Sequence, residues 1–109
     1  MKKTVLLITV SLALAASAAF AEDAKVNWEK NCQKCHGADG KGETMQGKKL
    51  KVKDYTDPKV QASFKDEEAI KITKEGKKEG DKNLMPKFGD KLSDQEIKDL
   101  IAYVRKFKK

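Results

Sequence analysis

The sequence predicts an all-α protein, built as one small domain of short helices. Apolar residues recur at helical spacing near both ends of the chain, from Ala24 to Cys32 and from Ile97 to Val104. Ser93 followed three positions later by Glu96 matches a capping box, the pair of polar residues that begins a helix. A weak alternation of apolar and charged residues over 50–55 is assigned to an extended loop, so no strand is expected.

The first 21 residues have the features of a secretory signal peptide. Two lysines near the start precede an apolar run over residues 5–20, and Ala19-Phe20-Ala21 fits the small-x-small cleavage pattern. The apolar run is short for a membrane span, and no cysteine follows the cleavage site to carry a lipid. We therefore predict a cleaved signal peptide over residues 1–21, a mature domain over residues 22–109, and a periplasmic location without a stable membrane anchor.

The mature chain is predicted to begin with a helix from Asp23, its cap, to about Gln33. Four glycines between residues 37 and 47 indicate an irregular loop, in which the backbone can pass close to a flat ligand. Asp57-Pro58 then suits the cap and first position of a short helix that runs to about Phe64.

Another helix is predicted from Asp66 to about Glu75. Acidic residues favour the positive N-terminal end of a helix, and Gly76 can end it. The side of this helix that is expected to be buried consists of Ala69, Ile70, Ile72 and Thr73.

The last third of the chain is predicted to contain a turn, a loop and a closing helix. Residues 76–82 are expected to form a charged turn, and residues 84–89 a stiff apolar loop around Pro86. The closing helix starts at the capping box, where Leu92 and Ile97 are placed to contact each other across the helix start. Its apolar stripe consists of Ile97, Leu100, Ile101 and Val104, widened by Tyr103.

Cys32-Gln33-Lys34-Cys35-His36 is the pattern that covalent haem attachment requires. Each thiol can add to a vinyl group of haem as a thioether, and the adjacent imidazole can then bind the iron. Both cysteines and the single histidine of the chain lie in this pentapeptide. A structural zinc site would need a fourth ligand, a thioredoxin-like dithiol would need a βαβ unit, and a plain disulfide would leave His36 unexplained. We predict one haem c per chain, held by Cys32, Cys35 and His36.

The mature part contains few residues with which to build an apolar core. Leucine, isoleucine, valine and phenylalanine account for 15 of residues 22–109, a share typical of disordered chains, although the pattern is helical. The haem macrocycle would supply the missing interior, and its bonds to the chain would restrict the unfolded state. We therefore expect the apoprotein to be largely unfolded.

The sixth position of the iron must be filled from elsewhere in the chain or stay open. Met85 is the favoured ligand, because Leu84, Pro86 and Phe88 would hold its thioether in a stiff apolar loop. Met45, in a loop of glycines and lysines with little to shield it, and a deprotonated lysine are the alternatives. The predicted iron ligands are thus His36 and Met85.

Taken together, these motifs resemble those of the class I c-type cytochromes, above all the small bacterial periplasmic members. The resemblance covers essentially residues 24–107. It implies about four short helices wrapped around one haem c, with the first and last helices crossing so that Trp28 lies against Leu100 and Tyr103. Some members carry a proline after the histidine, whose carbonyl accepts the ring N–H. No proline stands in Gly47-Lys48-Lys49-Leu50, so the sequence names no acceptor for His36.

The expected function is that of a periplasmic one-electron carrier, not an enzyme. Histidine and methionine stay bound in both oxidation states of the iron, and they leave no position for a substrate. The alternatives are a haem enzyme or gas sensor with an open or labile sixth position, and a haem-free disulfide or metal-binding module.

Charge suggests the kind of partner. Without Lys2 and Lys3, the 24 basic residues fall to 22 against 17 acidic ones, a net charge of +5. We expect a monomer whose redox partners have acidic surfaces, membrane oxidases or reductases among them, and no nucleic-acid binding. The alternative is that the lysines only keep the protein in solution. The lysines that could surround the haem edge are Lys34, Lys48, Lys49, Lys51, Lys53, Lys82 and Lys87.

Overall fold

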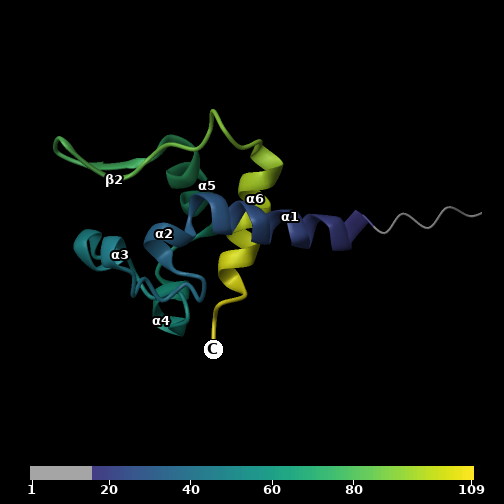
Figure 1. The fold of residues 1–109 in the computed structure, drawn as a ribbon, viewed down its shortest axis with the longest axis horizontal. Helices are drawn as coiled ribbons and strands as arrows, with labels where there is room; N and C mark the ends of the chain where they lie inside the picture. The colour runs from purple at the N-terminus through teal and green to yellow at the C-terminus, as the bar shows by residue number, and fades with distance from the viewer. Residues whose placement is uncertain (1–15) are drawn as a thin grey trace, which may run out of the picture.

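The computed structural model describes residues 16–109, with side chains from Ala24 onward. Its helices are α1 (Ala16–Asn31), α2 (Gln33–His36), α3 (Met45–Leu50), α4 (Pro58–Ala62), α5 (Asp66–Glu75) and α6 (Asp94–Arg105). An antiparallel hairpin of β1 (Lys77–Glu79) and β2 (Lys82–Met85) joins α5 to the segment before α6 (Figure 1). The described part is mostly helical, as predicted. The predicted signal peptide lies largely outside the described residues and stays a prediction.

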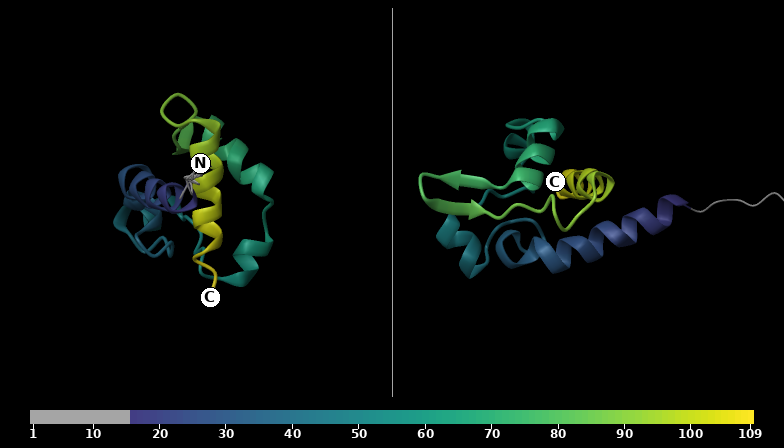
Figure 2. Two further views of the ribbon diagram at one scale, coloured as in Figure 1. Left: turned by 90° about the vertical axis from the view of Figure 1, so that its right-hand side faces the viewer. Right: turned by 90° about the horizontal axis from the view of Figure 1, so that it is seen from above.

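The first and last helices cross and enclose the core (Figures 1 and 2). Trp28 of α1 is 3% exposed and Leu100 of α6 is 2% exposed, and both belong to one apolar cluster. The ring of Trp28 also lies 5.7 Å from that of Tyr103, measured between centroids. The crossing that the family resemblance implied is therefore confirmed. The cluster of buried residues consists of Trp28, Cys32, Phe88, Leu92, Ile97, Leu100 and Val104.

Helix α6 has the start and the apolar face that the sequence predicts. The Ser93 hydroxyl accepts a hydrogen bond from the Glu96 amide at 3.1 Å, and the Ser93 amide donates to the Glu96 carboxylate at 3.0 Å. A cap of this kind typically stabilises a helix by about 1 kcal/mol. All four residues of the predicted stripe are buried: Ile97, Leu100, Ile101 and Val104.

Helices α4 and α5 lie where they were predicted, with small differences. Asp57 caps α4 by accepting a hydrogen bond from the Lys59 amide at 2.9 Å, and α4 ends at Ala62. Helix α5 ends at Gly76, whose φ of 81° suits glycine. Thr73 is buried as expected, but Ile72 is 38% exposed, so its predicted burial is wrong.

Three element predictions are wrong. Asp23 lies inside α1 rather than capping it, because the alanine-rich segment before it continues the helix. Met45 belongs to α3 and not to a loop, because the Thr44 hydroxyl caps this helix by accepting from the Gly47 amide at 2.8 Å. The third is the segment predicted as a charged turn and a loop.

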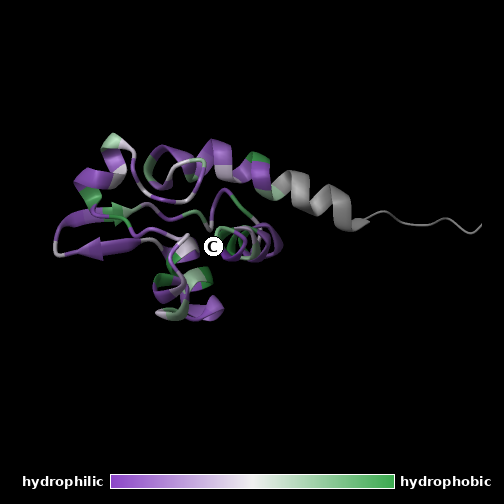
Figure 3. Ribbon diagram, turned by 90° about the horizontal axis from the view of Figure 1, so that it is seen from below, coloured by the Kyte–Doolittle hydropathy of each residue, from purple (hydrophilic) through white to green (hydrophobic). Residues whose placement is uncertain are grey.

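That segment forms the β1–β2 hairpin. Gly80 has a φ of 59° and lets the chain reverse between the two short strands. Hydropathy rises along β2 toward its C-terminal end, where Leu84 and Met85 are partly buried (Figure 3). With the hairpin and two additional helices of six or fewer residues, the described chain has more elements than the four short helices expected. Within residues 16–109, no helix is both long enough and apolar enough to cross a membrane.

Candidate haem-binding site

The pentapeptide of residues 32–36 forms one helical turn that continues from α1. The Cys32 amide donates to the Trp28 carbonyl at 2.9 Å, and the His36 amide donates to the Cys32 carbonyl at 3.0 Å. Residues three and four positions apart share a helix face, so Cys32, Cys35 and His36 lie on the same side of this turn. The backbone thus brings together the two thiols and the imidazole.

The two cysteines are free thiols in different surroundings. Cys32 is buried in the core, and burial together with the nearby Cys35 raises its pKa to about 12. Cys35 is partly exposed. No disulfide links them, and no group of three or more His, Cys, Asp or Glu residues in the described chain could hold a metal ion.

His36 lies among aromatic rings. Its ring centroid is 5.4 Å from that of Tyr55 in a stacked arrangement and 5.7 Å from that of Trp28. Burial lowers the pKa of His36, so the imidazole is neutral at pH 7, the form that binds a metal. Burial also raises the pKa of the Tyr55 hydroxyl.

The Nδ1 atom of His36 is buried and has no hydrogen-bond partner among the described residues. Buried polar atoms of proteins are nearly always paired, because an unpaired one loses its hydration without compensation. The acceptor that the sequence could not name is therefore not supplied by the described chain either. A neutral, partly buried imidazole beside two free thiols fits the donor set that haem c requires.

The loop after His36 fixes the carbonyl groups of this turn. The Trp28 indole N–H donates to the Gly37 carbonyl at 2.9 Å, and the Thr44 hydroxyl donates to the Cys35 carbonyl at 2.8 Å. A Cβ atom at Gly47 would overlap the Cys35 carbonyl oxygen, so α3 can lie this close only with glycine there. The sequence reasoning missed Thr44, although a threonine just before a helical segment is a recognisable cap.

Met85 is the last residue of β2 and packs, partly buried, against the core cluster that contains Cys32. Residues shortly after Met85 are hydrogen-bonded to the end of α5. The Phe88 amide donates to the Thr73 carbonyl at 3.0 Å, and the Gly89 amide donates to the Lys74 carbonyl at 3.1 Å. Met45, by contrast, is 90% exposed, as its predicted lack of shielding implied. Burial distinguishes the two methionines, and ligation by Met85 stays a prediction.

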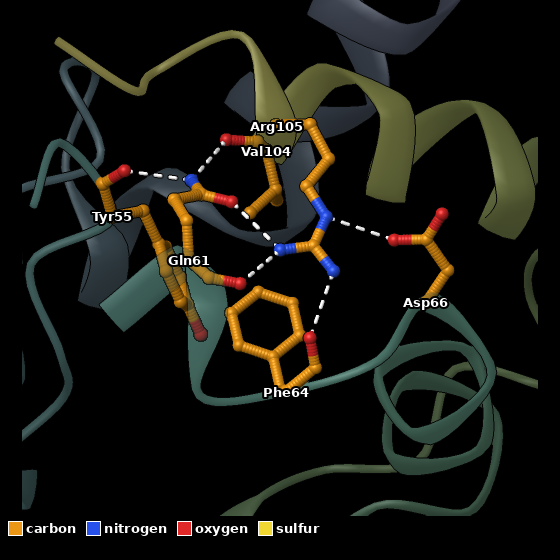
Figure 4. Close-up of polar contacts among 6 residues, drawn as sticks. All are labelled: Tyr55, Gln61, Phe64, Asp66, Val104 and Arg105. Carbon is orange, nitrogen blue, oxygen red and sulfur yellow. Dashed lines mark hydrogen bonds and ion pairs between the residues drawn. The ribbon is translucent and has the colours of Figure 1, made fainter. Parts of the chain in front are cut away.

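A polar network centred on the buried Gln61 links the backbone of Tyr55 to α6 (Figure 4). The Gln61 amide group donates to the Tyr55 carbonyl at 2.7 Å and to the Val104 carbonyl at 2.9 Å. Arg105 donates to the Gln61 carbonyl at 2.5 Å and to its side-chain oxygen at 3.0 Å. The burial of Gln61 was not predicted. This side chain is only 5% exposed, and nothing near it in the sequence indicates that.

Comparison with known proteins identifies the family. The family model described as cytochrome c oxidase, cbb3-type, subunit III matches residues 19–104. Among solved structures, the chain is similar to the KustC0563 c-type cytochrome, with 34% identity, a TM-score of 0.69, and coverage of 80% of this chain and 99% of that one. A Tyr-to-Phe mutant of Kustc0563 matches with 35% identity, a TM-score of 0.69, and coverage of 79% and 99%. The search of curated proteins gave no match. The chain therefore belongs to the cytochrome c family that this model describes, and it is a small c-type cytochrome, a haem protein of electron transfer.

Proposed function

We propose that the protein carries single electrons with one covalently bound haem c whose iron is held by His36 and Met85. The observation that carries this proposal is the single turn of residues 32–36. It presents two free thiols beside an imidazole that burial keeps neutral, the form that binds a metal. The chain belongs to the c-type cytochromes, whose cofactor is haem c, and this turn has the groups to hold it.

The chain would hold the haem at several points. Cys32 and Cys35 would form the thioethers, and a ring nitrogen of the neutral His36 imidazole would bind the iron. Met85 would supply a soft thioether, which favours the reduced form and raises the reduction potential. When bound, haem c supplies reversible one-electron chemistry at its iron. Trp28 and Tyr55 contact the His36 ring and would hold it in a fixed orientation.

Two protein ligands would leave no iron position for a substrate, so we propose a carrier and not an enzyme. Location in the periplasm follows in this proposal from the signal peptide predicted over residues 1–21. A haem enzyme or gas sensor would instead have an open or labile sixth position, with Met85 serving only in packing.

The proposed partners are redox proteins with acidic surfaces. The seven lysines predicted to steer them are all exposed. Helix α3 and the hairpin, which carry several of these lysines, lie at the same end of the molecule (Figures 1 and 2). Steering of this kind weakens with ionic strength, because salt screens the attraction between unlike charges. The rate of electron transfer to an acidic partner should therefore fall as salt is added, and an unchanged rate would remove steering from the proposal.

The absorption spectrum of the ferric protein tests the ligand set. With haem confirmed by a pyridine haemochrome assay, the weak methionine-to-iron band at the red edge should be present. It should disappear in Met85→Ala and persist in the matched control Met45→Ala, since Met45 is 90% exposed. A high-spin ferric spectrum of the unaltered protein, or a band that survives in Met85→Ala, would contradict ligation by Met85.

A further inference from the structure

Gly76 lies between α5 and β1, directly against the backbone that carries Met85. A Cβ atom built on Gly76 would lie 2.9 Å from the Met85 carbonyl oxygen, 3.0 Å from the Lys87 amide nitrogen and 3.2 Å from the Pro86 carbonyl carbon. Ordinary van der Waals contact of a Cβ begins at about 3.4 Å, and all three neighbours are backbone atoms that cannot rotate away. A side chain at position 76 would therefore push the Met85 segment outward.

The same segment is held on both sides of this contact, by β1 and by α5. Lys77 pairs with Met85 in the hairpin, and further along the chain Phe88 and Gly89 donate to the carbonyls of the last turn of α5. The Gly76 amide itself donates to the Ile72 carbonyl at 2.7 Å, so Gly76 belongs to the end of that helix. The position of the Met85 backbone is thus set by how closely it can approach α5 at Gly76.

We propose that Gly76 is the positioning residue for Met85: by lacking a side chain, it lets the Met85 segment lie against α5 and holds the thioether at the depth that iron ligation needs. The inference rests on the proposed ligation by Met85. Gly76 acts through the Met85 backbone and does not itself touch the cofactor.

Crowding has to be separated from backbone strain, and two other glycines allow this. Gly76 and Gly80 both have a positive φ, 81° and 59°, so alanine is strained at either position, and more so at Gly76, whose ψ of 177° places it in a region that essentially only glycine occupies. Gly89 has no left-handed φ and supplies the case of crowding without that strain. A Cβ on Gly80, however, would meet no atom within 4 Å. Gly76→Ala adds strain and crowding, whereas Gly80→Ala adds strain only, within the same hairpin region.

The experiment measures imidazole binding to the ferric holoprotein and the intensity of its methionine-to-iron band. Imidazole can occupy the iron only when Met85 has left it, so its apparent Kd is inversely proportional to the population of the released state. We expect the Kd of Gly76→Ala to fall about tenfold, with a weaker band, and that of Gly80→Ala to stay within about twofold of the unaltered protein. Equal Kd values for the two variants would overturn the positioning role.

If Gly76→Ala gives no folded holoprotein, a second variant tests the same inference. A Cβ on Gly89 would lie 2.9 Å from the Lys74 carbonyl oxygen, and Gly89 has no left-handed φ. Gly89→Ala should also lower the imidazole Kd, because it separates the same segment from α5, and an unchanged Kd would contradict the inference. If Met85→Ala leaves the ferric spectrum unaltered, ligation by Met85 is overturned and the role of Gly76 with it. If the band depends on Met85 but not on Gly76, only the positioning role fails.

Discussion

Replacing Arg105 by alanine tests whether the Gln61 network holds α6 to the middle of the chain. The guanidinium of Arg105 donates four hydrogen bonds: two to Gln61, one to the Phe64 carbonyl at 2.9 Å and one to the Asp66 carboxylate at 2.8 Å. Its central carbon also lies 4.2 Å from the centroid of the Phe64 ring. These contacts join residues 39 to 44 positions apart in the chain.

The contacts differ in their expected contributions to stability. The pair with Asp66 is exposed and contributes about 0–1 kcal/mol. Loss of the donor to the buried Gln61 oxygen costs about 1–3 kcal/mol, and loss of the contact with the Phe64 ring about 0.5–1 kcal/mol. We therefore expect Arg105→Ala to lower the free energy of unfolding by about 2–4 kcal/mol.

Denaturant unfolding of the holoprotein, followed by far-ultraviolet circular dichroism, measures this loss. Asp66→Ala is the control that removes the exposed pair together with one favourable charge at the start of α5, and it should cost about 1 kcal/mol. Arg105→Lys should recover less than half of the loss, because an ammonium cannot reproduce the planar fork of the guanidinium. If Arg105→Ala costs no more than Asp66→Ala, the Gln61 network does not stabilise the fold.

Three further results are expected. A Cys32→Ala, Cys35→Ala double variant, which cannot form the thioethers, should show little helical circular dichroism, and a well-ordered spectrum would contradict the dependence of folding on haem. Gly47→Ala should destabilise the holoprotein by about 2–3 kcal/mol in denaturant unfolding, because its Cβ would overlap the Cys35 carbonyl, whereas Gly80→Ala should cost less. Hydrogen bonds from Ser93 and Asn27 hold the pKa of Glu96 below its usual range, so their stabilisation is present at neutral pH and is lost as the pH falls through that lowered pKa. Stability measured against pH should thus decline less steeply on the acid side for Glu96→Gln, and identical slopes would exclude this contribution.

The elements that were predicted correctly are those specified by residues close together in the sequence. Ser93 and Glu96 are three positions apart, so the start of α6 can be recognised without knowledge of the rest of the chain. The β1–β2 hairpin could not be recognised, because its lysine-rich strands lack the alternation that indicates a half-buried strand. Helix α3 was missed because it contains Gly47, a poor helix former that is there for its close contact with Cys35.

Some residues in and around the candidate site can likewise be identified from local sequence, and others only from the fold. The proposed attachment motif is contiguous, because two thioethers and a histidine ligand would have to reach one flat molecule, so its three residues could be proposed from spacing alone. Gln61 and Gly76 act through backbone atoms brought near them only by the fold. Gln61 bonds the Val104 carbonyl 43 positions away, and no local pattern encodes such a contact.

The crossing of α1 and α6 also constrains the order of events during biosynthesis. The Asn27 amide donates to the Glu96 carboxylate at 3.1 Å across 69 positions, and Trp28 packs on residues of the last helix. A nascent chain therefore displays its cysteines long before the helix that buries Cys32 has been synthesised. Because the haem-free chain is expected to be largely unfolded, both thiols would stay accessible until haem is attached, and docking of the C-terminal helix would follow attachment.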